Sequence, residues 1–255
     1  MKFIRELRMG AGKQYKTGSV VSTYPRPLLV LNFDESGLDI IKDPVFSIDP
    51  AKFDDACKQK LEELHPISVV DFCDTQTKVM SETYGTIGAK DPFKKFVATV
   101  NSLVRVGCPW KTVVVDSVSG LGDVILAHMA ETSSSSMASA LKWAPMVGGK
   151  IHQCLGVMTA LQCHIVFICH CSSPDKDETT GIVDRAPLVP SKWLRDRIGT
   201  LVSQFFYQEI QGGKAVVYTT NDATVFVKGI GARWPSGLPT KVGADFQSIY
   251  GKELK

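Results

Sequence analysis

Residues 10–17 read Gly10-Ala-Gly-Lys-Gln-Tyr-Lys-Thr17, and this stretch decides how the rest of the sequence is interpreted. It follows the pattern GxxxxGK[ST] except that Tyr15 stands at the position of the last glycine. In this pattern backbone N–H groups cradle a phosphate, the lysine reaches the β- and γ-phosphates and the hydroxyl binds Mg²⁺. An expected strand at 2–7 and an expected helix at 18–23 flank it, which is the order that a phosphate loop needs.

The loop predicts a site for ATP with Mg²⁺. The predicted ATP-binding residues are Gly10, Gly12, Lys13, Gln14, Tyr15, Lys16, Thr17 and Gly18. Glycine positions in such a loop tolerate unusual backbone angles, so Tyr15 requires either a relaxed loop or a strained one. The alternative interpretation is a basic turn that only resembles a phosphate loop.

Composition places the chain among ordinary globular proteins. Its 255 residues are 44% apolar and 22% charged, and 29 basic against 26 acidic residues give a net charge of +3. Because this excess is small, any DNA contact has to come from a local patch. No apolar run approaches the roughly 18 residues of a membrane span. The N-terminus MKFIRELRMG lacks the apolar core of a signal peptide, which favours a cytoplasmic location without membrane contact.

The cysteines are scattered rather than paired as CxxC. Without a signal peptide we expect them to be reduced, buried thiols. Cys163-His164 and Cys169-His170-Cys171 flank the apolar run 165–168. Ligands at the two ends of a strand that rises about 3.3 Å per residue cannot share one ion without a bend, so this grouping argues against zinc.

Short apolar runs alternate with helical stretches along most of the chain. The expected strands are 27–33, 67–72, 112–115 and 164–169, and the expected helices are 54–64, 92–106 and 151–161. Near-continuous apolar strands suit a parallel sheet that is buried on both faces. The later runs 202–211, 214–220 and 224–228 are joined by turn residues and predict antiparallel hairpins. The predicted fold class is therefore α/β, with a mainly parallel central sheet flanked by helices and hairpins toward the C-terminus.

Three polar residues follow expected strands and are the candidate catalytic residues. Asp116 follows one apolar run, where such proteins hold Mg²⁺, and is predicted as a metal ligand with Thr17. Glu35 can polarise the attacking water, and His170 can contact the γ-phosphate. Ligands of open α/β sheets bind outside the carboxyl ends of the strands, which favours these roles. A solvated acidic turn at Glu35 and a histidine bonded to backbone at His170 are the alternatives.

Taken in this order, the elements resemble the RecA-type core ATPases, and within them the phage-encoded RecA-like proteins of single-strand annealing and recombination. The resemblance spans roughly residues 2–235. It implies a RecA-like P-loop NTPase core at 1–235 and a C-terminal tail at 236–255. It implies that Glu35 is the catalytic glutamate and Asp116 the Walker B aspartate. It also implies that His170 links the nucleotide state to a long polar DNA-binding loop at 172–190.

Two groups of basic residues are candidates for further contacts. Beside the long loop, a basic cluster with an aromatic residue suits the backbone and a stacked base of single-stranded DNA; its members are Lys192, Trp193, Arg195 and Arg197. The alternative is a solvated helix with Trp193 partly buried. Lys228 and Arg233 resemble a pair that related ATPases place across a subunit interface, where a cation stabilises the γ-phosphate in trans. The alternative there is a solvated basic hairpin end.

The resemblance implies an ATPase that is stimulated by DNA and promotes annealing or strand exchange in phage recombination. Its implied partners are single-stranded DNA, further copies of the chain in a ring or filament, and a single-strand-binding protein, in the host cytoplasm. Three other functions stay open on the sequence. They are a nucleotide-gated binding module with little turnover, a helicase or packaging-type motor on the same core, and a structural protein with an inactive phosphate loop.

Overall fold

The computed structural model describes residues 3–10, 13–34, 41–73, 91–132, 140–172, 175–176, 179, 183–221, 225–227, 231–232 and 237–251. The strands are β1 (Arg5–Gly10), β2 (Leu28–Asn32), β3 (Phe46–Ser47), β4 (Ile67–Asp71), β5 (Thr112–Asp116), β6 (His164–His170), β7 (Asp175–Lys176), β8 (Val183–Arg185), β9 (Gln204–Gln211), β10 (Lys214–Tyr218), β11 (Val225–Val227), β12 (Gly231–Ala232) and β13 (Lys241–Gly243). The helices are α1 (Lys13–Thr23), α2 (Phe53–Cys57), α3 (Pro92–Arg105), α4 (Val118–Thr132), α5 (Ala140–Met158), α6 (Lys192–Arg197) and α7 (Phe246–Tyr250).

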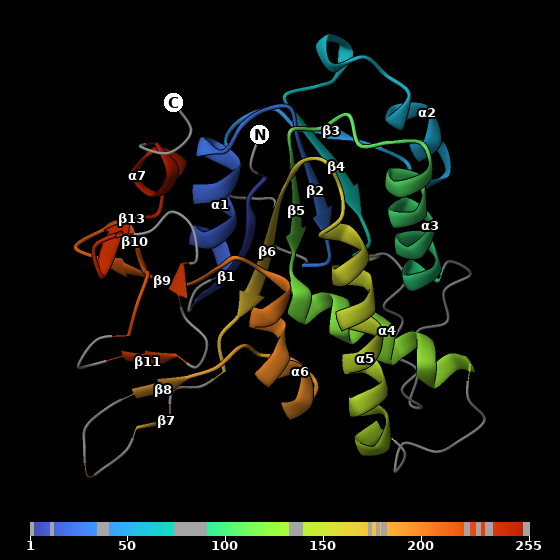
Figure 1. Cartoon of the computed structure of the whole chain (residues 1–255). Coiled ribbons are helices and arrows are strands. Elements are labelled where there is room, and N and C mark those ends of the chain that lie inside the picture. The colour runs from blue at the N-terminus through green and yellow to red at the C-terminus, as the bar shows by residue number, and fades with distance from the viewer. Residues whose placement is uncertain are drawn as a thin grey trace.

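One large sheet forms the centre of the molecule (Figure 1). Its strand order is β13-β10-β9-β1-β6-β5-β2-β4-β3, and β12 pairs with β9. All pairings from β9 across to β3 are parallel, whereas β10 runs antiparallel to both β9 and β13. The predicted α/β fold, with a mainly parallel sheet and antiparallel strands toward the C-terminus, is confirmed.

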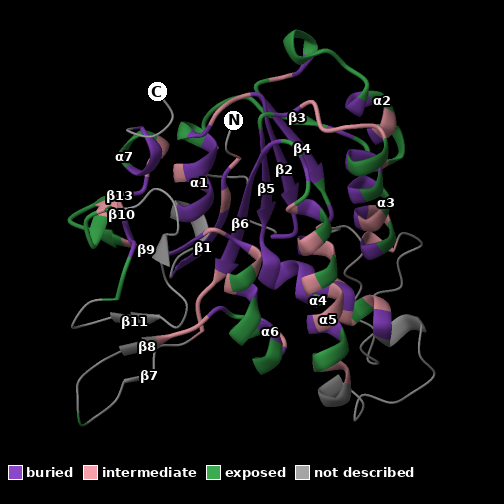
Figure 2. Cartoon of the chain, viewed as in Figure 1, coloured by how far each residue is buried: buried purple, intermediate pink, exposed green. Residues whose placement is uncertain are grey.

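Helices cover both faces of this sheet. One apolar cluster joins the sheet to α3, α4 and α5, and a second joins it to α1 and α7. All residues of β2 and β5 are buried, and Figure 2 shows the central strands as a continuous buried layer. A strand buried on both faces has no solvent side for polar residues, which explains the continuous apolar runs in the sequence.

The predicted helices agree with the structure to different degrees. α3 matches its expected range because Asp91 caps it through the N–H groups of Phe93 and Lys94, and Pro92 occupies its first turn. α5 begins well before the expected 151. The expected helix 54–64 is wrong in its second half, because α2 ends at Cys57 and Leu61 is exposed rather than part of an apolar stripe.

Two charged side chains of β1 are fully buried and join the N-terminal strand to the C-terminal helix. Arg8 Nε donates to Glu6 Oε1 at 2.6 Å, and the hydroxyls of Tyr24 and Tyr250 each donate to Glu6 Oε2 at 2.5 Å. A further guanidinium N–H of Arg8 donates to the carbonyl of Ala244 at 2.8 Å. These bonds satisfy charges that burial removes from water.

The segment expected as a tail is part of the domain. Its strand β13 pairs with β10, and α7 buries Ile249 and Tyr250 against α1. The physical reason is that Tyr250 supplies a hydroxyl to the buried carboxylate of Glu6, so the fold needs this segment. The expected boundary at residue 235 therefore does not mark the end of the packed structure.

The predicted hairpin between 214–220 and 224–228 is also wrong. β11 pairs in parallel with β8, which is antiparallel to β7, in a separate three-stranded sheet. The free edge of β10 is filled by β13, so β11 has no place beside it. The hairpin of β9 and β10, in contrast, is confirmed.

Replacement of Tyr250 tests the role of the C-terminal helix. Tyr250→Phe removes a hydroxyl that donates to a buried carboxylate, so we expect the free energy of unfolding to fall by about 1.5–3 kcal/mol. The matched control is Tyr218→Phe, whose hydroxyl donates at 2.5 Å to the half-buried Glu209, where water can replace it. Urea unfolding should show a smaller loss in the free energy of unfolding for Tyr218→Phe than for Tyr250→Phe. Equal losses would contradict the structural role proposed for the Tyr250 hydroxyl.

Candidate nucleotide site

Lys16 lies buried in α1 at the point where β1 and β6 end. Its ammonium group donates to the carbonyl oxygens of Gly10 at 2.8 Å and Cys169 at 3.0 Å, and it lies 3.4 Å from Nδ1 of His170. Burial lowers the pKa of Lys16, and the two carbonyl oxygens replace the water that burial removes. The lysine that the sequence predicts for phosphate binding is therefore at the carboxyl edge of the sheet.

The predicted phosphate loop becomes helical earlier than expected. α1 begins at Lys13 rather than at residue 18, so Tyr15 lies in its first turn. Helical backbone suits any L-residue, and no described residue other than glycine has a positive φ. Tyr15 therefore needs no strained backbone. Because the first N–H groups of a helix have no partner within it, those of residues 13–16 are available to an anion.

Two glycines allow backbone segments to meet at this edge. A Cβ atom at Gly10 would lie 2.2 Å from the carbonyl oxygen of Gln208, and one at Gly120 would lie 2.8 Å from the carbonyl oxygen of Phe33. Both distances are too short for any side chain. Gly10 is thus required by the close approach of β9 to the end of β1, in addition to any contact with phosphate.

Thr17 and Asp116 contact each other directly. Thr17 Oγ1 donates to Asp116 Oδ2 at 2.6 Å, and both residues are buried. Burial raises the pKa of Asp116 to about 6, against the opposing effect of the Thr17 hydrogen bond. A hydroxyl and a carboxylate are hard oxygen ligands, and Mg²⁺ commonly takes one or two carboxylates together with waters and substrate phosphates. The two predicted metal ligands therefore fit this ion.

His170 and Asp34 form a second polar group beside the first. His170 Nε2 lies 2.9 Å from Asp34 Oδ2, and the Ser117 hydroxyl donates to Asp34 Oδ1 at 3.2 Å. The other ring nitrogen of His170 faces Lys16. Since an ammonium group has no acceptor, the Nδ1 atom accepts from it and Nε2–H donates to the carboxylate. The histidine therefore bridges the lysine and Asp34.

The backbone of His170 is bonded to the chain segment that leads into α6. Leu188 N–H donates to the carbonyl of His170 at 2.8 Å. The Ser119 hydroxyl donates to the carbonyl of Leu188 at 2.7 Å and accepts from the N–H of His170 at 3.1 Å. The backbones of Cys171 and Pro187 also pair in an isolated antiparallel β-bridge. A displacement of His170 would thus act directly on residues 186–190.

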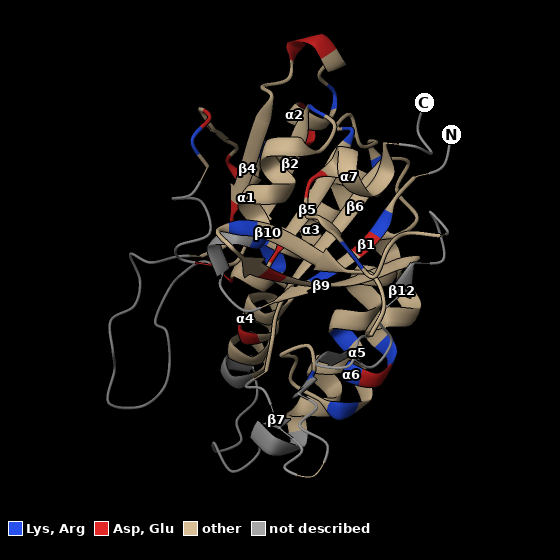
Figure 3. Ribbon diagram, turned by 90° about the vertical axis from the view of Figure 1, so that its left-hand side faces the viewer, with Lys and Arg blue, Asp and Glu red and all other residues tan. Residues whose placement is uncertain are grey.

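The helix α6 carries the basic residues predicted to contact DNA. Ser191 caps its amino end by accepting from the N–H of Leu194 at 3.2 Å. Trp193 is 42% exposed, with the Arg197 guanidinium 5.0 Å from the centre of its ring and the His152 ring 5.4 Å away. Figure 3 shows basic residues gathered on α6. The cluster is therefore exposed rather than part of the core.

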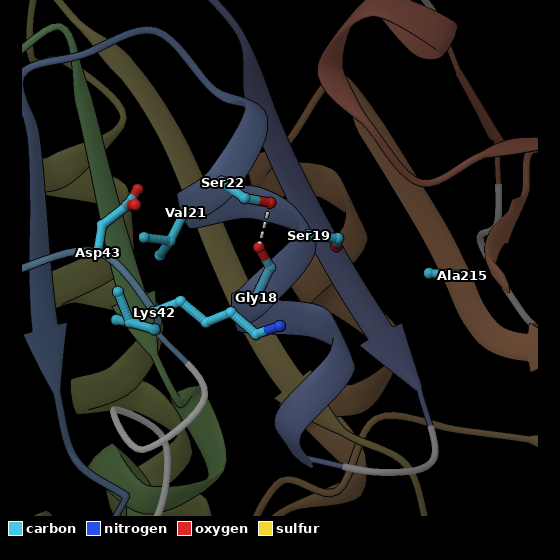
Figure 4. A pocket seen from close by; sticks show the side chains of 8 residues that line it. Gly18, Ser19, Val21, Ser22, Lys42, Asp43 and Ala215 are labelled. Atoms are coloured by element: carbon cyan, nitrogen blue, oxygen red, sulfur yellow. Dashed lines mark hydrogen bonds between the residues drawn. The ribbon is translucent and has the colours of Figure 1, made fainter. Parts of the chain in front are cut away.

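A cavity lies along the outer side of α1. Its volume is about 540 Å³. Figure 4 shows Lys42 and Asp43 on one side of the helix and Ala215 on the other, with Gly18 and Ser22 between them. Asp43 forms a partly exposed ion pair with Arg26 at this side of the opening. The cavity begins beside the residues that directly follow Thr17.

Several predicted residues, or their side chains, lie outside the described part of the chain. Gly12, Glu35, Lys228 and Arg233 lie outside the described residues, and only the backbone is described for Lys13, Gln14 and Tyr15. Of the expected DNA-binding loop 172–190, the described parts include short strands β7 and β8 rather than a single irregular loop.

Asp34, Ser117 and Ser119 belong to the site although no sequence motif predicted a role for them. Asp34 directly precedes Glu35 at the end of β2, and Ser117 directly follows Asp116 at the end of β5. Because β2 and β5 are neighbouring parallel strands, residues just past their carboxyl ends lie close together. The positions of Asp34 and Ser117 directly after two expected strands could therefore have indicated that they belong to the site. The position of Ser119 in the sequence gave no such indication, because its contact with Leu188 joins residues that are far apart along the chain.

The comparison with protein families agrees with this geometry. A family model described as an AAA domain matches residues 9–229. The chain belongs to this AAA-domain family. Its members are P-loop ATPases, and the match includes Lys16, Thr17, Asp116 and His170. A search of curated proteins finds no match.

Two further findings concern the described part of this AAA domain. None of its described helices is both long and apolar enough to cross a membrane. In the same ranges, no three His, Cys, Asp or Glu side chains come together as metal ligands. A Mg²⁺ ion held by Thr17 and Asp116 would take its remaining oxygen ligands from phosphate and water.

Replacement of Asp116 tests the raised pKa of this carboxyl group. A carboxyl with a raised pKa binds more protons in the folded state, so stability falls as the pH rises from about 3.8 through about 6. Asp116→Asn removes the buried charge. We therefore expect the ligand-free variant to exceed the wild type in stability by about 1–3 kcal/mol at neutral pH. The difference should shrink toward pH 4, as measured by urea unfolding at several pH values.

The control is Asp54→Asn at an exposed position. Hydrogen bonds from Ser102 and Arg105 lower the pKa of Asp54, so its ionised form favours the folded state. The control should therefore lose stability at neutral pH. An Asp116 variant that is less stable than the wild type at neutral pH would contradict the expected gain in stability.

Proposed function

We propose that the protein is an ATP-dependent, RecA-like protein that binds single-stranded DNA and promotes annealing or strand exchange. The supporting observation is one continuous series of polar contacts that runs from Lys16 through His170 to Leu188. It connects the nucleotide site to the segment that leads into the basic helix α6. An ATPase whose nucleotide state controls a DNA-binding surface needs such a connection.

The nucleotide would bind along α1. Lys16 exchanges the carbonyl oxygens of Gly10 and Cys169 for phosphate oxygens, and the first N–H groups of α1 contact the same phosphates. Thr17 and Asp116 hold Mg²⁺, which neutralises charge on the phosphates when bound. The cavity beside Gly18 lies farther along the helix and takes the nucleoside. Its volume of about 540 Å³ is within the usual range for small-molecule pockets, about 300–1,000 Å³.

Hydrolysis would use Glu35 as the base. The carboxylate accepts a proton from water while the water oxygen attacks the γ-phosphorus and the bond to the β–γ bridging oxygen breaks. Its neighbour Asp34 is held at the site by hydrogen bonds with Ser117 and His170, which supports a role for Glu35 there. His170, between Asp34 and Lys16, then detects whether a γ-phosphate is present.

Single-stranded DNA would bind across α6. Trp193 offers a partly exposed ring to a base, while Lys192, Arg195 and Arg197 offer charge to the backbone. Because the net charge is only +3, this local cluster has to provide the attraction. The carboxyl ends of the parallel strands and α6 lie at the same lower end of the molecule in Figure 1, which favours coupling between the two sites.

Assembly on DNA would complete the site. Lys228 and Arg233 are proposed to act in trans on the γ-phosphate of a neighbouring copy in a ring or filament. A single-strand-binding protein is a further proposed partner. We place the protein in the cytoplasm of a phage host, as the recombination group implies.

Replacement of the lysine and the glutamate tests the ATPase. Lys16→Ala should reduce ATP turnover to background because it removes the cation that binds the phosphates. Glu35→Gln should retain ATP binding but lose at least about 100-fold in turnover, since general base catalysis typically contributes that much. Both are measured with and without single-stranded DNA. The matched control is Lys58→Ala, an exposed lysine paired with Asp55. Normal turnover in the Lys16 variant would overturn the assignment.

Replacement of α6 side chains tests the DNA surface. Trp193→Ala should weaken binding of a labelled oligothymidine about 5- to 150-fold, from a stacking energy of about 1–3 kcal/mol. Arg197→Ala should also reduce the slope of log K against log salt concentration by about one unit, because one cation fewer contacts the phosphates. Fluorescence anisotropy at several salt concentrations measures both effects, and thermal unfolding controls for folding. Unchanged affinity in both variants would place the DNA surface elsewhere.

A nucleotide-gated binding module with little turnover is the second candidate. It is favoured by Lys16, whose ammonium is already bonded to two carbonyl oxygens that phosphate has to displace. ATP-dependent DNA binding without measurable hydrolysis would support it. A helicase or packaging-type motor on the same core predicts displacement of a blocking duplex instead.

A further inference from the structure

Two cysteine side chains from different loops meet at the amino ends of β5 and β6. Sγ of Cys108 lies 3.5 Å from Sγ of Cys163. Cys163 directly precedes β6, and Cys108 lies in the loop that leads into β5. These strands are parallel neighbours, with Thr112 paired to His164. The register of the sheet therefore holds the two loops side by side.

The surroundings of the two thiols differ. Cys163 is buried, and the turn that carries it is fixed by Arg5, which donates to the carbonyls of Thr159, Leu161 and Cys163. Cys108 is only partly buried and follows Gly107, which has a φ of 121°. Because glycine has no Cβ to restrict its backbone, a small shift of the Cys108 loop should cost less than a shift of the turn that Arg5 holds.

The two sulfur atoms also affect each other chemically. The hydrogen bond with Cys163 lowers the pKa of Cys108, whereas the same contact and burial raise the pKa of Cys163. A thiolate is the form that attacks a disulfide. Cys108, which is both more exposed and more readily ionised, is thus the attacking group, and Cys163 is the group that completes the exchange.

We propose that Cys108 and Cys163 form an oxidation-sensitive pair that a low-molecular-weight disulfide converts to an intramolecular disulfide. The Cys108 thiolate attacks one sulfur of the reagent, forms a mixed disulfide and releases one reagent thiolate. Cys163 then loses its proton and attacks the Cys108 sulfur, and the second reagent thiolate leaves. Two protein thiols are oxidised and one reagent disulfide is reduced to two thiols, so atoms and electrons balance.

The bond would lie at the end of the sheet opposite Lys16 and Asp116. β5 and β6 run their full length between the two cysteines and the nucleotide site (Figure 1). The crosslink would close a loop of 55 residues along the chain, which restricts the unfolded state. We therefore expect the oxidised protein to unfold at a higher temperature, by on the order of 5 °C, with its nucleotide site intact.

The test uses the full chain, reduced, freed of reductant and exposed to oxidised glutathione. In the wild type we expect a loss of two hydrogen atoms by intact mass and a crosslinked peptide that joins Cys108 to Cys163. Cys163→Ser should instead stop at the mixed disulfide on Cys108, and Cys108→Ser should form no crosslink. The control Cys154→Ser, at a partly buried cysteine of α5, should behave as the wild type.

The wild-type result decides the proposal even where a variant fails to fold. A crosslink to Cys57 or another cysteine, a mixed disulfide that persists in the wild type, or no reaction in the folded protein would each overturn it. Thermal unfolding of the oxidised and reduced wild type gives an independent readout. An unchanged or lower midpoint after crosslinking would contradict the expected stabilisation.

Discussion

The buried ammonium group of Lys16 is the interaction on which the arrangement of the site depends. A buried charge is tolerated only where polar groups replace its water, and here the carbonyl oxygens of Gly10 and Cys169 do so. These carbonyls belong to the ends of β1 and β6. The lysine therefore ties α1 to both strands at the place where a phosphate would bind, and its position is set by the sheet as much as by the loop that carries it.

The order of the strands explains why separate sequence motifs meet. β6 lies between β1 and β5, so the end of β6 with His170 stands between Gly10 of β1 and Asp116 of β5. β2 on the other side of β5 brings Asp34 into the same group. The sequence was sufficient to predict this edge, because continuous apolar runs indicate parallel buried strands and a parallel sheet has all its carboxyl ends on one side. The motif then identified Lys16, and its spacing from a strand-end aspartate identified Asp116.

Features that depend on distant partners could not be predicted in this way. Tyr250 and Glu6 are separated by 244 residues, and no local pattern indicates that a tyrosine near the C-terminus binds a carboxylate on the first strand. The pairing of β11 likewise depends on β13 having filled the edge of β10. The tail expected at 236–255 and the hairpin expected between 214–220 and 224–228 were both inferred from local turns and composition. These features indicate where an element lies but not which neighbouring element it packs or pairs with.

The same long-range contacts bear on function through α1. Near the amino end of this helix Lys16 is fixed by the strand ends, and one turn farther along Ser19 accepts a hydrogen bond from the buried guanidinium of Arg8. Tyr24, directly after the helix, accepts from the same guanidinium. Arg8 in turn holds the carbonyl of Ala244 in the C-terminal segment. The helix is thus attached to the sheet at Lys16 and at Ser19 without any ligand. A site built on a fixed helix spends less of its binding energy on ordering the protein, and more remains to stabilise charge that develops on the phosphate.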